Sequence, residues 1–231
     1  MTSSRLCECL NPQYKTREWS ELALHPEVQD TNCDAWKRLL DLVEQAARDG
    51  REEFAPQREM PPEDWEQIVT LPPSIAKLKS VKHLMLYGSY LVRVPPEIGG
   101  MTALKEFTPY TSYRLHYFPY EITRCLELKE STVSTRALYG NQDYRPPFPR
   151  LPAISPGGAP EHCSVCCGAF AESGPLQYWI SLWVATDVLP LLVHACSAAC
   201  VGRLPQPATR YVAEAHQGGL EIKQPERLYL L

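Results

Sequence analysis

The sequence lacks the features that mark a membrane protein or a general nucleic-acid-binding protein. Its most apolar run, Leu176 to Ala195, is interrupted by Asp187 and Pro190, and a charge at membrane depth costs about 2.5–3.5 kcal/mol on insertion scales. Lys and Arg total 23 against 27 Asp and Glu, a formal charge of −4, so there is no basic excess to attract a duplex or an anionic lipid surface. We therefore expect no membrane span, and nucleic acid is an unlikely partner.

The motifs of common catalytic sites are also missing. The sequence has no Gly-rich phosphate loop, no GxSxG motif and no paired-carboxylate motif. Cys7, Cys9 and Cys33 could be combined with His25 as a nucleophile and a base, but no spacing enforces that pairing. The first 15 residues show no apolar core behind a positive start, which a signal peptide would have. We therefore expect a cytoplasmic protein that is not an enzyme.

Proline and cysteine, by contrast, are abundant, with 22 and nine residues. Proline is excluded from helix interiors and central strands, so we expect short elements joined by defined turns rather than a long helical bundle. Residues 36–47 are an exception, because their apolar side chains follow i, i+3, i+4, i+7 spacing between a candidate N-cap at Asp34 and a candidate stop at Gly50. This pattern predicts an amphipathic helix that covers the end of a neighbouring domain, and a shorter helical piece is expected over 22–28.

Three consecutive stretches repeat one pattern at offsets of 23 and 24 residues. They begin at Leu71, Val94 and Phe118, each followed by proline, and apolar residues recur at relative positions 1, 5, 8 and 11. A period of 20–29 residues with this spacing is the signature of leucine-rich repeats, whose units bury their leucines only against their neighbours. The pattern LPxxIxxLxxLxxLxL resembles the proline-bearing class of leucine-rich repeats, and it covers about residues 68–141.

The repeats depart from that family where an Asn normally bonds the turn after each strand. This sequence has Ser89, Ser112 and Arg136 at these positions. Serine can make part of the hydrogen bonding, whereas arginine cannot substitute in the same way. The third unit also has Ser131 where a leucine is expected, so we interpret it as a degenerate terminal repeat. Three units are about the minimum for such an array, so we expect other segments of the chain to cover its two ends.

Five of the nine cysteines fall between Cys163 and Cys200. In a reducing compartment, clustered cysteines indicate metal binding. Cys163 and Cys166 form a Cys-x2-Cys turn followed closely by Gly, and Cys196 and Cys200 lie four apart on one face of an expected helical turn. The apolar runs on either side of 185–187 predict a β-hairpin between the two pairs. Four soft ligands in tetrahedral array select Zn²⁺.

The order of knuckle, hairpin and Cys-Ser-x-x-Cys is similar to treble-clef zinc fingers, in particular TRASH/YHS-like fingers, over about residues 161–204. The resemblance implies that the metal ligands are Cys163, Cys166, Cys196 and Cys200. Cys167 or His194 could replace a neighbouring ligand. A four-thiolate site has no open coordination position, and no HxE or HExxH signature is present, so we expect structural rather than catalytic Zn²⁺.

In leucine-rich repeats the residues between the strand leucines face the concave surface, and this resemblance predicts where a protein partner binds. Tyr is over-represented at interface hot spots because it brings large buried area together with a polar group. The predicted partner-binding residues are His83, Met85, Tyr87, Glu106, Thr108, Tyr110, Glu130, Thr132 and Ser134.

These patterns together predict an α+β fold, a short leucine-rich-repeat solenoid with an N-terminal helical cap and a C-terminal treble-clef zinc module. The Pro- and Gly-rich stretch 146–160 marks a boundary, because such runs are extended and semi-rigid. The predicted domains are 1–66 (helical cap and connector), 67–145 (three repeats), 146–160 (linker) and 161–231 (zinc module and tail).

The function we expect is binding of another protein. Our specific hypothesis is a bacterial immunity protein or comparable inhibitor, which neutralises a cognate toxin through the concave face. The acidic body and the Tyr- and Glu-bearing strands would suit a basic toxin domain. Two alternatives stay open at this point, a regulatory adaptor whose zinc finger recruits a second protein, and a zinc-finger factor that handles nucleic acid or metal.

Overall fold

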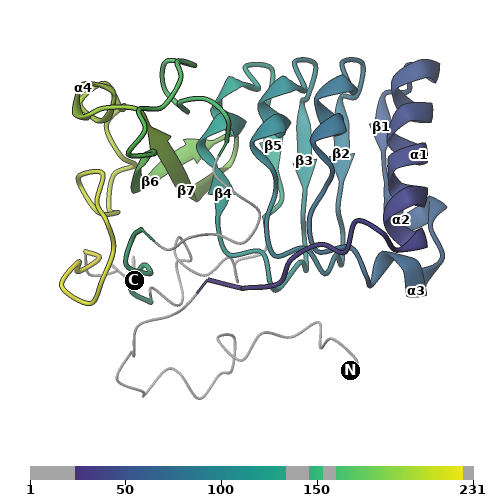
Figure 1. The fold of residues 1–231 in the computed structure, drawn as a ribbon, viewed down its shortest axis with the longest axis horizontal. Coiled ribbons are helices and arrows are strands. Elements are labelled where there is room, and N and C mark those ends of the chain that lie inside the picture. Colours follow the sequence, from purple (N-terminus) through teal and green to yellow (C-terminus); the bar gives the residue numbers. More distant parts are fainter. Residues whose placement is uncertain (1–23, 134–145, 153–159, 226–231) are drawn as a thin grey trace, which may run out of the picture.

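The computed structural model describes residues 24–133, 146–152 and 160–225. Helices and strands are mixed, as the α+β prediction requires (Figure 1). None of the helices in these ranges is both long and apolar enough to cross a membrane. In chain order the elements are α1 (Asp34–Asp49), β1 (Glu53–Phe54), α2 (Pro56–Glu59), α3 (Pro62–Trp65), η3 (Pro73–Lys77), β2 (His83–Met85), η4 (Pro96–Gly100), β3 (Glu106–Thr108), β4 (Phe118–Pro119), η5 (Tyr120–Arg124), β5 (Glu130–Ser131), β6 (Leu176–Val184), β7 (Asp187–Ala195) and α4 (Ala198–Val201).

Helix α1 confirms the predicted amphipathic helix. Its N-cap is Cys33 rather than Asp34, because the Cys33 sulfur accepts a hydrogen bond from the Trp36 backbone N–H at 3.4 Å. Its C-terminal stop is Gly50, which has a positive φ of 67° that glycine adopts without strain. The described part of the piece expected over 22–28 is not helical. The α1 side chains buried against the first repeat are Ala35, Trp36, Leu39, Val43 and Ala46.

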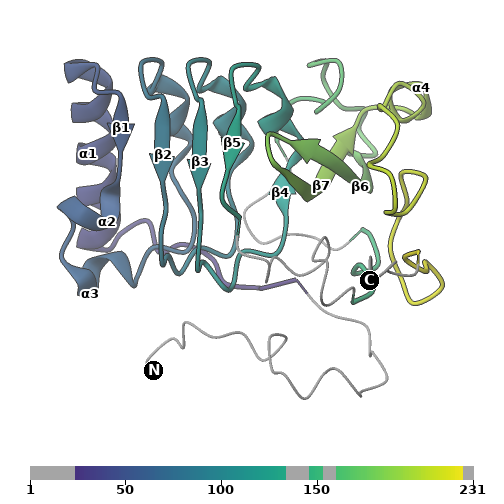
Figure 2. The ribbon, with the colours of Figure 1, turned by 180° about the vertical axis from the view of Figure 1, so that it is seen from behind.

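Strands β1, β2, β3 and β5 form a parallel sheet in that order (Figure 2). His83 pairs with Glu106, and Glu106 pairs with Glu130, so the structural register equals the sequence offsets of 23 and 24 residues. The short helices η3, η4 and η5 stack behind the strands, and their close approach requires glycine. A Cβ at Gly99 would lie 2.6 Å from a backbone oxygen of η5, and one at Gly100 would lie 2.9 Å from the Ala76 Cβ.

The repeated apolar positions form the core between strands and 3₁₀ helices. We call residues 71–131 the repeat stack. Position 5 of each unit is a fully buried isoleucine, and positions 1 and 8 are buried as well. The apolar pattern therefore identifies the interior correctly. The buried members are Leu71, Ile75, Leu78, Val81, Leu84, Leu86, Val94, Ile98, Met101, Leu104, Phe107, Phe118, Ile122 and Cys125.

Ser89 and Ser112, in the turns after β2 and β3, form a hydrogen-bonded pair. Ser89 Oγ donates to Ser112 Oγ at 2.7 Å, and Ser112 Oγ donates to the Leu86 carbonyl oxygen at 2.9 Å. The Ser89 backbone N–H also donates to Ser112 Oγ at 3.2 Å. These bonds satisfy backbone groups in the buried turn, as expected for serine. Arg136 lies outside the described residues.

The departure at Ser131 has a structural reason, because the β6–β7 hairpin ends the repeat stack at this residue. Thr186, in the hairpin turn, accepts a hydrogen bond from the Ser131 backbone N–H at 3.1 Å and donates to the Ser131 carbonyl oxygen at 2.8 Å. Ser131 Oγ lies 2.8 Å from Asp187 Oδ2 and 3.0 Å from the Val184 carbonyl oxygen. A leucine could not make the two bonds of the Ser131 hydroxyl, so the polar side chain suits a repeat that packs against the hairpin instead of a further repeat.

The hairpin itself matches the predicted runs, and it is hydrogen bonded into the repeat stack. Strands β6 and β7 pair antiparallel around a two-residue turn, and β4 pairs with β7 in parallel through Phe118 and Leu191. One continuous core cluster contains buried residues from α1, all three repeats and both hairpin strands. The domain boundaries proposed from sequence stay predictions.

The described part of the Pro-rich stretch packs on the outer side of the hairpin. Phe148 is fully buried beside Trp179, with ring centroids 5.6 Å apart, and the Trp179 Nε1–H donates to the Pro149 carbonyl oxygen at 2.8 Å. Residues 216–219 cover the same side, since the Leu151 N–H donates to the Gln217 carbonyl oxygen at 2.7 Å. Residues 146–152 are therefore packed against the hairpin.

Candidate metal centre and strand face

Four cysteine sulfurs converge at the end of the molecule that the hairpin closes. Those of Cys163, Cys166, Cys196 and Cys200 all lie within 4.8 Å of one another. Cys196 Sγ is 3.6 Å from both Cys166 Sγ and Cys200 Sγ, far longer than the ~2.05 Å of a disulfide. All four cysteines are free thiols. They are the residues predicted as ligands, and the group they form could hold a metal ion.

The first pair sits on a tight turn between the Pro-rich stretch and β6. The Cys167 N–H donates to the Cys163 carbonyl oxygen at 2.9 Å, which closes the turn. Backbone N–H groups then point at sulfur, because Val165 and Cys196 donate to Cys163 Sγ at 3.4 and 3.3 Å, and Gly168 donates to Cys166 Sγ at 3.4 Å. Such N–H groups favour the thiolate over the thiol.

The second pair joins the end of β7 to α4. Cys196 follows the last residue of β7 and precedes the helix, whereas Cys200 lies within α4. The expectation that both cysteines share one helical turn is therefore wrong for Cys196. Ser197 is the N-cap, and its Oγ accepts a hydrogen bond from the Cys200 N–H at 3.3 Å. The strand end and the cap together set the direction in which Cys200 points.

The ionisation of these thiols differs within the cluster and bears on how it could hold a cation. Burial raises the pKa of Cys163, but the backbone N–H groups of Cys166, Val165 and Cys196 outweigh it and hold that pKa at about 6. The pKa of Cys200 is raised to about 12, because its hydrogen bond with the Cys196 sulfur and its burial both oppose the charge. Several thiolates at this spacing repel one another, so a full set of four ionises only with a bound cation.

The two alternative ligands lie outside the group. Cys167 is exposed, with a positive φ of 60°, and does not join the four-sulfur cluster. His194 is buried on β7, and its Nε2 lies 3.2 Å from the Gln177 Nε2. Burial lowers the pKa of His194 to about 4. Among the residues that the structure describes, the geometry brings together the four cysteines without either alternative.

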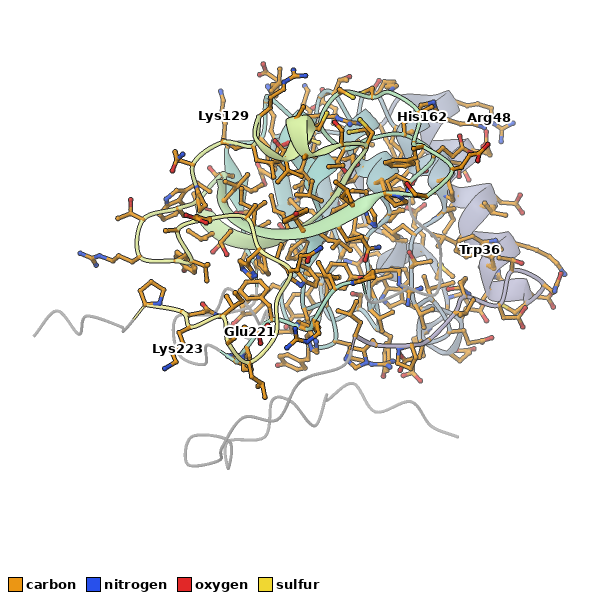
Figure 3. All side chains as sticks on the ribbon, turned by 60° about the vertical axis from the view of Figure 1, so that its left-hand side comes forward. Trp36, Arg48, Lys129, His162, Glu221 and Lys223 are labelled. Carbon is orange, nitrogen blue, oxygen red and sulfur yellow. The ribbon has the colours of Figure 1, made fainter. Side chains whose placement is uncertain are left out.

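The metal-site turn is also attached to the last repeat. Arg124, at the end of η5, donates from Nη2 to the carbonyl oxygens of Ser164 and Cys163 at 2.8 and 3.5 Å. Figure 3 shows His162, which precedes Cys163, near the upper edge of the molecule and Glu221 of the tail near the lower edge. Through Arg124, the candidate metal centre contacts the repeat stack.

The predicted partner-binding residues lie along the parallel sheet. We call this surface the strand face, formed by the outward side chains of β1, β2, β3 and β5 with the residues just after them. Tyr87 and Tyr110 are 53% and 44% exposed, and their rings lie side by side with centroids 5.9 Å apart and planes at 35°. Ser134 lies outside the described residues. The other members, His83, Met85, Glu106, Thr108, Glu130 and Thr132, are exposed or half-buried.

The carboxylates of the strand face lie in one row across the strands. Register places Glu53, His83, Glu106 and Glu130 side by side. His83 Nδ1 is 3.4 Å from Glu53 Oε2 and 3.7 Å from Glu106 Oε2, and its Nε2 lies 3.0 Å from Thr108 Oγ1. The face therefore carries an acidic row with one imidazole in its middle.

Sequence reasoning missed a second charged row beside it. Lys82, Lys105 and Lys129 follow the same register, because the Lys105 N–H donates to the Lys82 carbonyl oxygen at 2.7 Å and the Lys129 N–H donates to the Lys105 carbonyl oxygen at 2.9 Å. Lys82 pairs with Glu52. The signal was present, since the three lysines recur at the repeat offsets of 23 and 24 residues. Glu53 had no such signal, because β1 lies outside the repeated pattern.

Comparison with known proteins adds no relative, because no family model and no curated protein matches this chain. Arguments about its function therefore rest on its own residues.

Proposed function

We propose that this chain is a non-catalytic protein-binding module, a short leucine-rich-repeat array closed by α1 at one end and by a treble-clef zinc module at the other. Three features support the repeat assignment: pairing at the repeat offsets, stacked 3₁₀ helices, and a core made of the recurring apolar positions. The Ser89–Ser112 bonds supply the turn hydrogen bonding that asparagine gives in such repeats.

Zn²⁺ is the metal that we assign to the cysteine centre. Four cysteine sulfurs are its typical structural donor set, with Zn–S of about 2.3 Å. A tetrahedron of that size places sulfurs about 3.8 Å apart, and the Cys196 sulfur lies 3.6 Å from those of Cys166 and Cys200. With all four positions taken by protein, the ion would supply cross-linking and charge neutralisation only. Cys163, Cys166, Cys196 and Cys200 would hold the turn, the end of β7 and α4 together.

The strand face is the surface that we assign to partner binding. Its central feature, the exposed Tyr87–Tyr110 pair, is the observation that carries the proposal. Two large aromatic side chains on neighbouring strands lose little conformational entropy on binding and bury much area. The glutamate row favours basic side chains of a partner, and the lysine row beside it favours acidic ones. The two rows together would fix the position of the partner on the strand face.

The narrower proposal is that the partner is a toxin with a basic surface, which this protein inhibits by covering the active site. Its support is the acidic row beside the tyrosine pair on an overall acidic chain. An adaptor would use the same surface without blocking an enzyme. An inhibitor and an adaptor can be distinguished by the activity of the partner, because only an inhibitor abolishes that activity at one-to-one stoichiometry.

Capture of partners on the intact, metal-loaded protein tests this proposal. The wild type is compared with the Tyr87→Ala/Tyr110→Ala double variant and with Leu126→Ala, a matched control that truncates an exposed apolar residue outside the strand face. We expect the double variant to weaken the captured complex by at least 30-fold, about 2 kcal/mol, and the control to leave it within twofold. Equal binding by all three proteins, or no specific partner, would contradict the proposal.

A further inference from the structure

A cavity of about 300 Å³ lies apart from the strand face, and at one end it reaches Glu161 and His194, each two residues before a cysteine of the candidate metal centre. It runs beneath the first residues of all three repeats, from α1 at one end to β7 at the other, and residues 28–31 form one wall. Most of its lining is apolar, with side chains of Trp36, Leu71, Val94, Pro96, Tyr117 and Leu192. Its volume is at the lower end of the range for small-molecule sites.

One cation is set into this apolar wall. Arg93 lines the cavity and is only 9% exposed. Its Nη2 donates to the carbonyl oxygens of Glu27 and His25 at 2.6 and 3.2 Å, while its buried Nε has no acceptor. No carboxylate in the described ranges pairs with Arg93, because that of Glu27 pairs with Arg114 instead. The guanidinium therefore has two carbonyl dipoles and no counter-charge.

A nearly buried guanidinium without an anion is costly, and a bound anion would offset that cost. The other charged residues around the cavity narrow the choice of ligand. Glu97 is half-buried and Glu161 is exposed, and both line the cavity. Their charges disfavour a polyanion such as a nucleotide or an inorganic phosphate. A single negative charge attached to an apolar body fits both the cation and the walls.

We propose that this cavity binds a small monocarboxylate with an apolar chain or ring, with its carboxylate at Arg93 and its apolar part along Trp36, Val94 and Tyr117. The site is independent of the strand face, so its failure would leave the protein-binding proposal untouched. Arg93 also ties residues 25–27 to the start of the second repeat. A ligand that neutralises Arg93 would therefore strengthen the attachment of this segment.

Calorimetry on the full chain with three eight-carbon probes tests the proposal. Octanoate, octanol and octylammonium share one apolar chain and differ in charge. We expect octanoate to bind at one site, at least tenfold more tightly than octanol, and octylammonium to bind more weakly than octanol. Equal binding of octanoate and octanol, preference for the amine, or no binding of octanoate would each overturn the proposal.

Two single-residue variants test whether Arg93 is the group that binds the carboxylate of octanoate. Arg93→Met keeps the apolar stem and removes the charge, and it should bring octanoate within threefold of octanol without changing the affinity for octanol. Arg38→Met, on the exposed side of α1, is the matched control and should leave all three affinities unchanged. Unchanged octanoate binding in Arg93→Met would overturn the assignment. Should Arg93→Met fail to fold, the comparison of the three probes on the wild type still decides. Binding of an acidic peptide but not of octanoate would also count against a small-molecule site.

Discussion

The two ends of the repeat stack are closed in different ways. At the first end α1 buries a continuous apolar stripe, and exposed ion pairs such as Lys77–Glu44 and Arg38–Asp64 lie around it. At the second end the β6–β7 hairpin adds buried apolar side chains to the same core, and polar contacts join it to the stack as well, with Thr186 bonded to the Ser131 backbone and Arg124 bonded to the turn that carries Cys163. The first end is closed by the hydrophobic burial of one helix, whereas the second combines hydrophobic burial with hydrogen bonds whose partners must be held in place.

The difference follows from the chain segments that each end uses. Helix α1 is one stretch of 16 residues with its own caps. The second end combines the 163–168 turn, the hairpin and α4, which are separated along the chain and joined by β4–β7 pairing and by the cysteine centre. An end assembled from separate segments loses its geometry when one link is removed. We therefore expect the two ends to respond differently to metal removal, core truncation, acid and loss of single hydrogen bonds.

Removal of the metal should have the largest effect, and it should act on the second end only. Structural Zn²⁺ sites contribute apparent free energies of about 10–16 kcal/mol in zinc-finger peptides. In Cys196→Ser/Cys200→Ser we expect the amides of β5, β6 and β7 to lose hydrogen-exchange protection while those of α1, β2 and β3 keep it.

Cys167→Ser is the matched control for the metal prediction, because Cys167 lies outside the four-sulfur group. It should retain the wild-type exchange pattern. Equal loss of protection at both ends of the double variant would contradict the comparison, as would no loss at either.

Truncation of the α1 stripe should come next in size. Leu39 is fully buried, and Leu→Ala in a core costs about 2–5 kcal/mol. Urea denaturation of Leu39→Ala should show this loss in the free energy of unfolding, whereas Gln45→Ala on the exposed side of α1 should change it by less than about 0.5 kcal/mol. Metal content should be the same in both variants. Loss of metal from Leu39→Ala would mean that the two ends are not separable.

Acid should act through histidines that the fold buries, and His116 is the one whose pKa is lowered the most. Burial, with smaller contributions from His25 and Arg114, lowers the pKa of His116 to about 3. Since the unfolded chain takes up this proton near pH 6.5, stability should fall as pH drops from about 6.5 towards 3. The share of His116 in that loss between pH 7 and pH 5 is about 2 kcal/mol. Urea denaturation at both values should therefore show a smaller pH dependence for His116→Gln, and an unchanged one would contradict this assignment.

The smallest effect should come from a single hydrogen bond at the second end. Ser131→Ala removes the hydroxyl that contacts Asp187 and should lower the free energy of unfolding by about 1 kcal/mol. Thr132→Ala, an exposed neighbour, is the control and should have little effect. Ser131→Leu restores the repeat pattern and yet should also destabilise, because Asp187 and the Val184 carbonyl oxygen lose their partner. Stabilisation by Ser131→Leu would show that the hairpin does not depend on these bonds.

Some parts of the structure could be predicted from the amino-acid sequence, and others could not. Helix α1, the hairpin and the repeat core follow local periodicity, and each was predicted near its observed bounds. The four cysteines were predicted from their spacing. Sequence could not show that Cys196 lies before α4 rather than within a helical turn, because the end of β7 depends on pairing with β6.

Contacts between distant segments were beyond prediction for a physical reason. The role of Ser131 depends on a turn 55 residues later in the chain, where Thr186 supplies the missing partner. Arg93 carries no motif of its own, and only the fold buries it beside a cavity without a counter-charge. The three lysines recur at the repeat offsets, but only the pairing of the strands shows that they form a row beside the glutamates.

The metal content of the purified chain tests the account most directly. We predict one Zn²⁺ per chain by elemental analysis after gentle purification, unchanged in Cys167→Ser and lost in Cys196→Ser/Cys200→Ser. A wild type that carries clearly less than one metal ion per chain, and that keeps the protected β5–β7 amides without it, would contradict the claim that the cysteine centre closes the second end of the repeat stack.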